Sequence, residues 1–111
     1  MKFDTEKDGL QTLFTPYQVA LMEHIWDLNK NEKVGITSGE AYQFLIGKPE
    51  KKSRASYILF LNDMVEEGIL GYEEKTGKGG YHRVYYPKMD REGFKEYITE
   101  TINSKLEKIF S

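Results

Sequence analysis

Apolar residues follow two different patterns along the chain. In four segments they recur every three or four positions, which is the spacing of an amphipathic helix. Two later runs are strand-like, and the glycine-rich stretch between them is typical of a hairpin tip. The pattern predicts helices at about 16–28, 38–46, 51–67 and 91–110, a short strand at 34–36, and a hairpin with strands at 69–75 and 81–86.

Residues with capping properties stand where three of these helices would begin. Thr15 precedes Pro16, so an N-cap residue is followed by the residue favoured at the first helical position. Thr37 stands three residues before Glu40, the spacing at which hydroxyl and carboxylate each satisfy a free backbone N–H group. Asp90 is placed to cap the last helix. The starts of these helices are therefore indicated independently of the apolar pattern.

The third predicted helix has two different faces. At about 100° per residue, one face is apolar and is expected to pack on the core, whereas the other points away. Gly68 is expected to end the helix as its C′ residue. The predicted core face carries Ile58, Leu61, Met64 and Val65, and the opposite face carries Lys52, Ser56, Leu59 and Asp63.

The charges of this helix run against its dipole. Lys51, Lys52 and Arg54 gather at the N-terminal end, and Glu66 and Glu67 at the C-terminal end. A helix that only needed to be stable would carry the opposite arrangement. Cations at the positive end of the dipole indicate that an anion such as phosphate binds there. Two interpretations follow: a DNA-reading helix, or an ordinary surface helix behind a basic loop.

The distribution of charge matters more than its total. The chain has 111 residues, which is most simply one domain, and a net charge of −2, which does not by itself favour nucleic acid. Residues 30–56 carry six basic and three acidic side chains, and residues 75–88 carry four basic and no acidic ones. Residues 57–74, between them, carry five acidic and no basic ones. If the fold brings the two basic segments together, they form one positive face.

Three helices followed by a two-stranded hairpin form the winged helix-turn-helix arrangement, a mostly α, α+β fold. In it the third helix reads the major groove and the hairpin, or wing, lies over the flanking backbone. We expect the wing to bring Lys78 and Arg83 near the positive end of the third helix. The candidate contacts to phosphate are Lys51, Lys52, Arg54, Lys75, Lys78 and Arg83, and those to bases or sugars are Ser53, Ser56 and Tyr57.

Some of these candidates have an ordinary structural interpretation as well. By its helical angle Tyr57 is equally suited to the edge of the core. Lys75, Lys78 and Arg83 are also compatible with solvated side chains in a hairpin.

Several short motifs resemble the penicillinase-repressor family of winged-helix regulators. Leu13 to Trp26, with its Thr-Pro start and Met-Glu pair, is similar to the first helix of that family. The spacing of Thr37, Glu40, Tyr42 and Leu45 resembles its second helix. The end of its reading helix is similar to Leu61-Asn62 and Val65-Glu66-x-Gly68-x-Leu70, and its wing exit to Tyr85-x-Pro87.

The resemblance spans about residues 13–110 and implies a homodimeric transcriptional repressor that binds palindromic double-stranded DNA. The sequence departs from the family at Asp63, where a basic residue is usual, and at Leu59, where a hydroxyl is common. It departs again at Glu73 and Glu74, where the first wing strand is usually basic. These departures make the expected DNA surface less cationic.

The last predicted helix carries a continuous apolar seam. A helix of about 20 residues must bury such a seam, either by folding back on its own domain or by pairing with a second copy. The helix length and the resemblance both favour the dimer. The domain organisation is thus a loose arm at 1–12, a DNA-binding domain at 13–88 and a dimerisation helix at 89–111. The seam consists of Phe94, Ile98, Ile102, Leu106 and Ile109.

Other chemistry is not indicated. There is no cysteine, and the two histidines, His24 and His82, lie in different elements without metal-ligand spacing, so neither a metal site nor a cofactor is expected. No pairing of nucleophile and base stands out, and we do not expect an enzyme. No apolar run is long enough for a membrane span, and the polar N-terminus does not resemble a signal sequence. By elimination we expect a cytoplasmic protein.

The sequence therefore predicts a dimeric, sequence-specific DNA-binding regulator. The competing interpretation is a winged-helix module that docks on another protein, which the acidic Asp63, Glu73 and Glu74 would suit. A small-molecule sensor would need a pocket that the sequence does not reveal.

Overall fold

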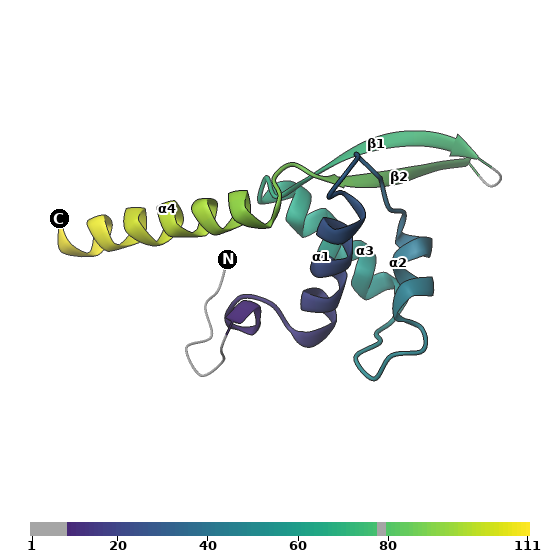
Figure 1. Ribbon diagram of the computed structural model, residues 1–111, viewed down its shortest axis with the longest axis horizontal. Helices are drawn as coiled ribbons and strands as arrows, with labels where there is room; N and C mark the ends of the chain where they lie inside the picture. The colour runs from purple at the N-terminus through teal and green to yellow at the C-terminus, as the bar shows by residue number, and fades with distance from the viewer. Residues whose placement is uncertain (1–8, 78–79) are drawn as a thin grey trace.

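In the part of the chain that the structure describes, four α-helices and one antiparallel hairpin form an α+β structure (Figure 1). The computed structural model describes residues 9–77 and 80–111. None of the helices described there is long and apolar enough to cross a membrane. In chain order the elements are η1 (Gly9–Thr12), α1 (Pro16–Leu28), α2 (Ser38–Leu45), α3 (Arg54–Glu66), β1 (Leu70–Gly77), β2 (Gly80–Pro87) and α4 (Arg91–Phe110).

The predicted caps are present at the starts of α2 and α4. The Thr37 hydroxyl accepts a hydrogen bond from the backbone N–H of Glu40 at 3.1 Å, and the Glu40 carboxylate accepts one from the backbone N–H of Thr37 at 3.0 Å. The Asp90 carboxylate accepts from the backbone N–H of Gly93 at 2.7 Å. Helix α1 begins at Pro16, as predicted.

Two of the predicted segments are shorter than expected. The third helix begins at Arg54, with Ser53 as its N-cap, so Lys51 and Lys52 belong to the preceding loop. The segment is held there because the backbone N–H of Lys52 donates to the Tyr57 hydroxyl at 2.6 Å. The strand predicted at 34–36 is a single β-bridge, in which Ile36 exchanges two backbone hydrogen bonds with Tyr85.

The core lies between α1, α2 and α3 and is closed by the hairpin base and the start of α4. Leu61 and Met64 are buried, as predicted, but Ile58 is 37% exposed. Its predicted place is taken by the aromatic residues Tyr57 and Phe60. These two aromatics complete a stripe at steps of three and four with Leu61 and Met64, and Ile58 lies about 100° around the helix from Tyr57.

Strands β1 and β2 pair over eight positions, from Leu70 opposite Pro87 to Gly77 opposite Gly80. Only the base of the hairpin packs on the helices: Leu70, Val84 and Tyr85 are buried, whereas every described residue of β1 from 72 onward is exposed. The hairpin therefore projects from the core along the upper edge of the molecule in Figure 1.

Helix α4 leads away from the rest of the molecule (Figure 1). With α4 included, the structure measures 53 × 29 × 26 Å. The first turn of α4 is attached to the core. Phe94 is 3% exposed and stacks on Phe14 at a centroid distance of 5.7 Å. The indole N–H of Trp26 donates to the carbonyl of Met89 at 3.2 Å. The predicted arm is corrected in part, because residues 9–12 form η1 and Leu10 packs against the core, while residues 1–8 lie outside the described structure.

Candidate nucleic-acid interface

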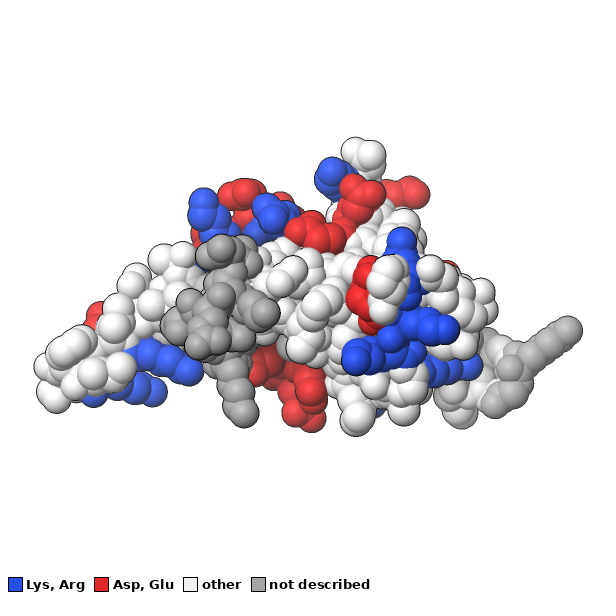
Figure 2. Space-filling view, turned by 90° about the horizontal axis from the view of Figure 1, so that it is seen from below, with Lys and Arg blue, Asp and Glu red and all other residues white. Residues whose placement is uncertain are grey.

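The α2–α3 loop and the first residue of α3 carry three exposed cations: Lys51, Lys52 and Arg54. We call these three residues the basic loop. In Figure 2 several Lys and Arg side chains gather over the part where Figure 1 places α2, α3 and their connection, with acidic atoms beside them. The guanidinium of Arg54 reaches back to α2, where a Cβ on Gly39 would lie 3.3 Å from Nη2.

Ser53 and Ser56 form the cap of α3. The Ser53 hydroxyl accepts from the backbone N–H of Ser56 at 3.3 Å, and the two hydroxyl oxygens lie 3.1 Å apart. Only one of the two hydroxyls donates to the other, so one O–H group is left to donate elsewhere. Both candidates therefore lie beside the basic loop, although their first function is local.

Tyr57 does not belong to this surface. Its side chain is fully buried, 0% exposed, and its hydroxyl is occupied by the backbone of Lys52. The prediction that Tyr57 contacts bases or sugars is wrong, and the alternative, a core position, is correct. The stripe of four apolar residues on α3 outweighs the polar hydroxyl, which reaches a partner from inside the core.

Arg83 belongs to β2, and its side chain contacts α3, but not at the positive end of that helix. Its Nη1 donates to Oδ1 of Asn62 at 3.0 Å, and its guanidinium lies 4.1 Å from the ring centroid of Tyr72. The hydroxyl of Tyr85 donates to the same Oδ1 at 2.7 Å. Because Asn62 stands only four residues before the end of α3 at Glu66, the expected position of Arg83 near the N-terminus of that helix is wrong.

The basic loop and Arg83 consequently remain apart. A cation of the 30–56 segment that does reach the hairpin is Lys33, whose ammonium lies 3.7 Å from the Glu73 carboxylate and 4.1 Å from the ring centroid of Tyr86. Figure 1 places the α2–α3 connection at the lower edge of the molecule and the hairpin along its upper edge. Lys75 is exposed on β1 opposite His82, and Lys78 lies outside the described residues. Asn62 was not identified from the sequence. In the sequence it stands out only within the Leu61-Asn62 pair of the family resemblance, which says nothing of a contact with the hairpin.

Helix α1 and the loop after α2 meet at a stack of three side chains. The His24 ring lies 3.7 Å from the Phe44 ring, nearly parallel to it, and the ammonium of Lys48 lies 4.7 Å from the centre of the same Phe44 ring. Burial lowers the pKa of His24; the Asp27 carboxylate opposes this shift, and Lys48 adds to it. The stack holds the end of α2 and the residue Lys48, which precedes the basic loop, against α1.

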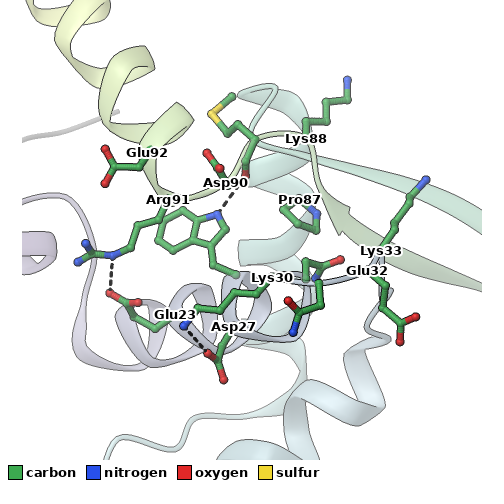
Figure 3. Close-up of a pocket in the computed structure, with 14 residues that line it drawn as sticks. Glu23, Asp27, Lys30, Glu32, Lys33, Pro87, Lys88, Asp90, Arg91 and Glu92 are labelled. Atoms are coloured by element: carbon green, nitrogen blue, oxygen red, sulfur yellow. Dashed lines mark hydrogen bonds and ion pairs between the residues drawn. The ribbon is translucent and has the colours of Figure 1, made fainter.

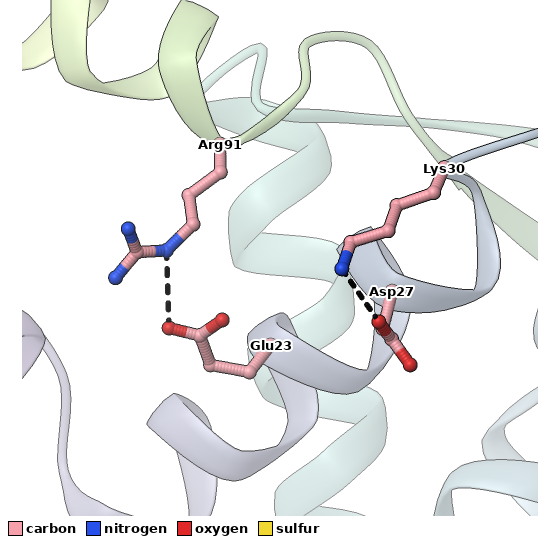
Figure 4. A network of polar contacts seen from close by, with 4 residues as sticks. All are labelled: Glu23, Asp27, Lys30 and Arg91. Carbon is pink, nitrogen blue, oxygen red and sulfur yellow. Dashed lines mark hydrogen bonds and ion pairs between the residues drawn. The ribbon is translucent and has the colours of Figure 1, made fainter.

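A hollow of about 680 Å³ separates the end of α1 from the connection between β2 and α4 (Figure 3). Acidic and basic side chains both line it, and two ion pairs lie there. Nε of Arg91 lies 3.2 Å from Glu23, and Nζ of Lys30 lies 3.1 Å from Asp27 (Figure 4). In the described part of the chain no group of three or more His, Asp or Glu residues could hold a metal ion. The hollow marks the joint at which α4 is fastened to the domain.

The predicted dimerisation seam is divided between two environments. Phe94 is buried and Ile98 is half-buried, packed on the core of its own domain. Ile102, Leu106 and Ile109 are 39%, 46% and 69% exposed. The second half of α4 thus presents an apolar stripe that the described residues do not cover.

Comparisons with protein-family models, with curated proteins and with solved structures find no match to this chain.

Proposed function

We propose that the protein is a homodimeric, sequence-specific DNA-binding regulator of transcription, acting as a repressor on a palindromic operator. In this proposal the fold is a winged helix-turn-helix, α3 enters the major groove and the β1–β2 hairpin is the wing. The order of three helices, a projecting hairpin and a further helix supports it.

The observation that carries the proposal is the basic loop. Lys51, Lys52 and Arg54 are exposed where the free N–H groups of α3 create a positive potential. The next acidic residue along α3 is Asp63, more than two turns away. A phosphate of the DNA backbone would meet both the cations and the helix terminus, which is the combination that fixes a reading helix over a groove.

The exposed half of α4 supplies the dimer contact. Ile102, Leu106 and Ile109 follow steps of four and three, so they form one stripe on the helix. Two copies related by a two-fold axis would cover these stripes mutually. A symmetric dimer places two copies of α3 about one DNA turn apart, roughly 34 Å, and would read a palindrome.

A salt titration tests the proposal. Binding to generic duplex DNA is measured by fluorescence anisotropy for wild type and for a Lys51→Ala, Lys52→Ala variant. Each phosphate contact contributes about 0.9 to the slope of log K against log salt, so the loss of two contacts per protomer should flatten the slope by about 2 to 4.

The matched control removes two exposed lysines, Lys30 and Lys88, which line the hollow beside α4. This variant has the same net charge as the first and should keep the wild-type slope. Equal slopes for all three proteins would remove the basic loop from the interface.

A protein-docking module is the second candidate, and one observation favours it. From residue 57 to residue 74 the chain has five acidic and no basic side chains, and the exposed Asp63, Glu66, Glu73 and Glu74 belong to that segment. Failure of micromolar wild-type protein to retard duplex DNA at low salt would favour this candidate over DNA binding.

A further inference from the structure

The exposed face of α3 is apolar in the half that follows the basic loop. Ala55 is exposed, Ile58 is 37% exposed and Leu59 is 67% exposed. The three residues are spaced by three and four positions and therefore lie on one side of the helix. Asn62, on the same side one turn further, carries the contact with the hairpin. The apolar stripe thus lies between the basic loop and the place where the wing meets α3.

Few other side chains on this face could read a base. Arg54 is the only cation of α3, and its guanidinium is placed against the start of α2. The amide oxygen of Asn62 already accepts two hydrogen bonds from the hairpin. The middle of the helix therefore offers neither the bidentate contact of arginine with guanine nor that of asparagine with adenine.

An exposed aliphatic side chain can distinguish one group in the major groove, the 5-methyl group of thymine. We propose that Leu59, flanked by Ile58, packs on a thymine 5-methyl group in each half of the operator. Leu59 is the specificity-determining residue of α3, and the recognised half-site contains a thymine whose replacement by uracil weakens binding. This inference rests on the proposed DNA-binding function and names the chemistry that its reading helix recognises.

The experiment begins with duplexes selected from a random library by the wild-type protein. Each thymine of one half-site is then replaced singly by deoxyuridine, which removes only the 5-methyl group. At one position the wild-type Kd should rise about fourfold, the effect of withdrawing one methyl group from an apolar contact. A Leu59→Ala variant should bind the thymine and uracil duplexes equally, because the apolar partner of the methyl group is gone.

The matched control is Leu28→Ala, which shortens another exposed leucine, at the end of α1. It should keep the wild-type preference for thymine. A Leu59→Gln variant tests the same site with a side chain of similar length, and circular dichroism checks that each variant is folded. Because Leu59 is two-thirds exposed, none of its substitutions should alter the fold.

The outcomes separate the two proposals. Selected duplexes that tolerate uracil at every position, or a thymine preference that persists in Leu59→Ala, would overturn the assignment of Leu59 and leave DNA binding intact. If the wild-type protein selects no duplex at all, the proposed function fails and the inference fails with it. The apolar stripe would then be a surface for another protein.

Discussion

Asn62 should be among the most sensitive polar positions of the chain. Its Oδ1 accepts the Tyr85 hydroxyl at 2.7 Å and Nη1 of Arg83 at 3.0 Å, and so joins the hairpin to α3. Tyr85 is only 3% exposed, and burial raises the pKa of its phenol. An Asn62→Ala variant would leave this phenol without its acceptor.

The loss of stability expected in Asn62→Ala follows from the two hydrogen-bond donors, Tyr85 and Arg83, that would lose their acceptor. An unpaired buried hydroxyl costs about 1–3 kcal/mol, and the partly exposed bond to Arg83 adds about 1 kcal/mol or less. We therefore expect the free energy of unfolding to fall by about 2–3 kcal/mol in Asn62→Ala. With a urea dependence of roughly 1–3 kcal/mol per molar for a domain of this size, the midpoint should fall by about 1 M or more.

Equilibrium urea unfolding, followed by the fluorescence of the single tryptophan, Trp26, measures this change. The control is Tyr85→Phe, which removes the donor instead of the acceptor. In the Tyr85→Phe background there is no buried hydroxyl to lose its partner, so Asn62→Ala should lower the free energy of unfolding by only about 1 kcal/mol there. An Asn62→Ala cost below about 0.5 kcal/mol, or the same cost in both backgrounds, would refute the role of Asn62 as the joint between wing and helix.

Three further predictions concern the dimer, the pH dependence and the joint of α4. Leu106→Glu should convert a dimer into a monomer in sedimentation equilibrium while leaving the monomer folded, because Leu106 is nearly half exposed; an unchanged mass would exclude the α4 dimer. Burial lowers the pKa of His24 in the folded state below its value in the unfolded state, so protonation of His24 favours unfolding. The contribution of neutral His24 to stability is therefore complete above about pH 6.5 and is lost as the pH falls below that value. The loss of unfolding free energy between pH 7.5 and 5.5 should therefore be smaller in His24→Gln than in wild type, and an equal loss would contradict the assignment. Phe94→Ala should lower the free energy of unfolding by about 3–5 kcal/mol, because it empties a fully packed aromatic site, and a cost near that of an exposed residue would show that α4 is not anchored there.

Much of the architecture follows from local signals that the sequence carries. Thr37 with Glu40, and Asp90, are capping residues whose partners lie three positions away, so the starts of α2 and α4 need no tertiary information. The glycine-rich stretch between two strand-like runs predicted the hairpin, and Gly80 indeed adopts a φ of +106°, which favours glycine. These signals are short-range, which is why they can be read along the chain.

Positions that depend on a partner distant in the chain could not be predicted in the same way. Whether Tyr57 faced DNA or the core depended on side chains far away in the chain, among them Tyr17, whose ring centroid lies 5.7 Å from that of Tyr57. The sequence predicts Arg83 near the positive end of α3, as a phosphate contact or a solvated side chain, but Asn62, 21 residues earlier, holds it on the other half of that helix. A charge count along the sequence does not include such a contact.

The apolar seam of α4 shows the division most clearly. The sequence by itself determined that one helix, Arg91–Phe110, carries an unbroken apolar stripe, because periodicity is a property of the helix alone. Only the tertiary structure decided where the domain stops covering it. The core reaches Phe94 and Ile98, and beyond Ile98 the helix has left the domain, so Ile102, Leu106 and Ile109 remain in contact with solvent. Burial is set by what lies across from a residue in space, and that is known only once the chain has folded.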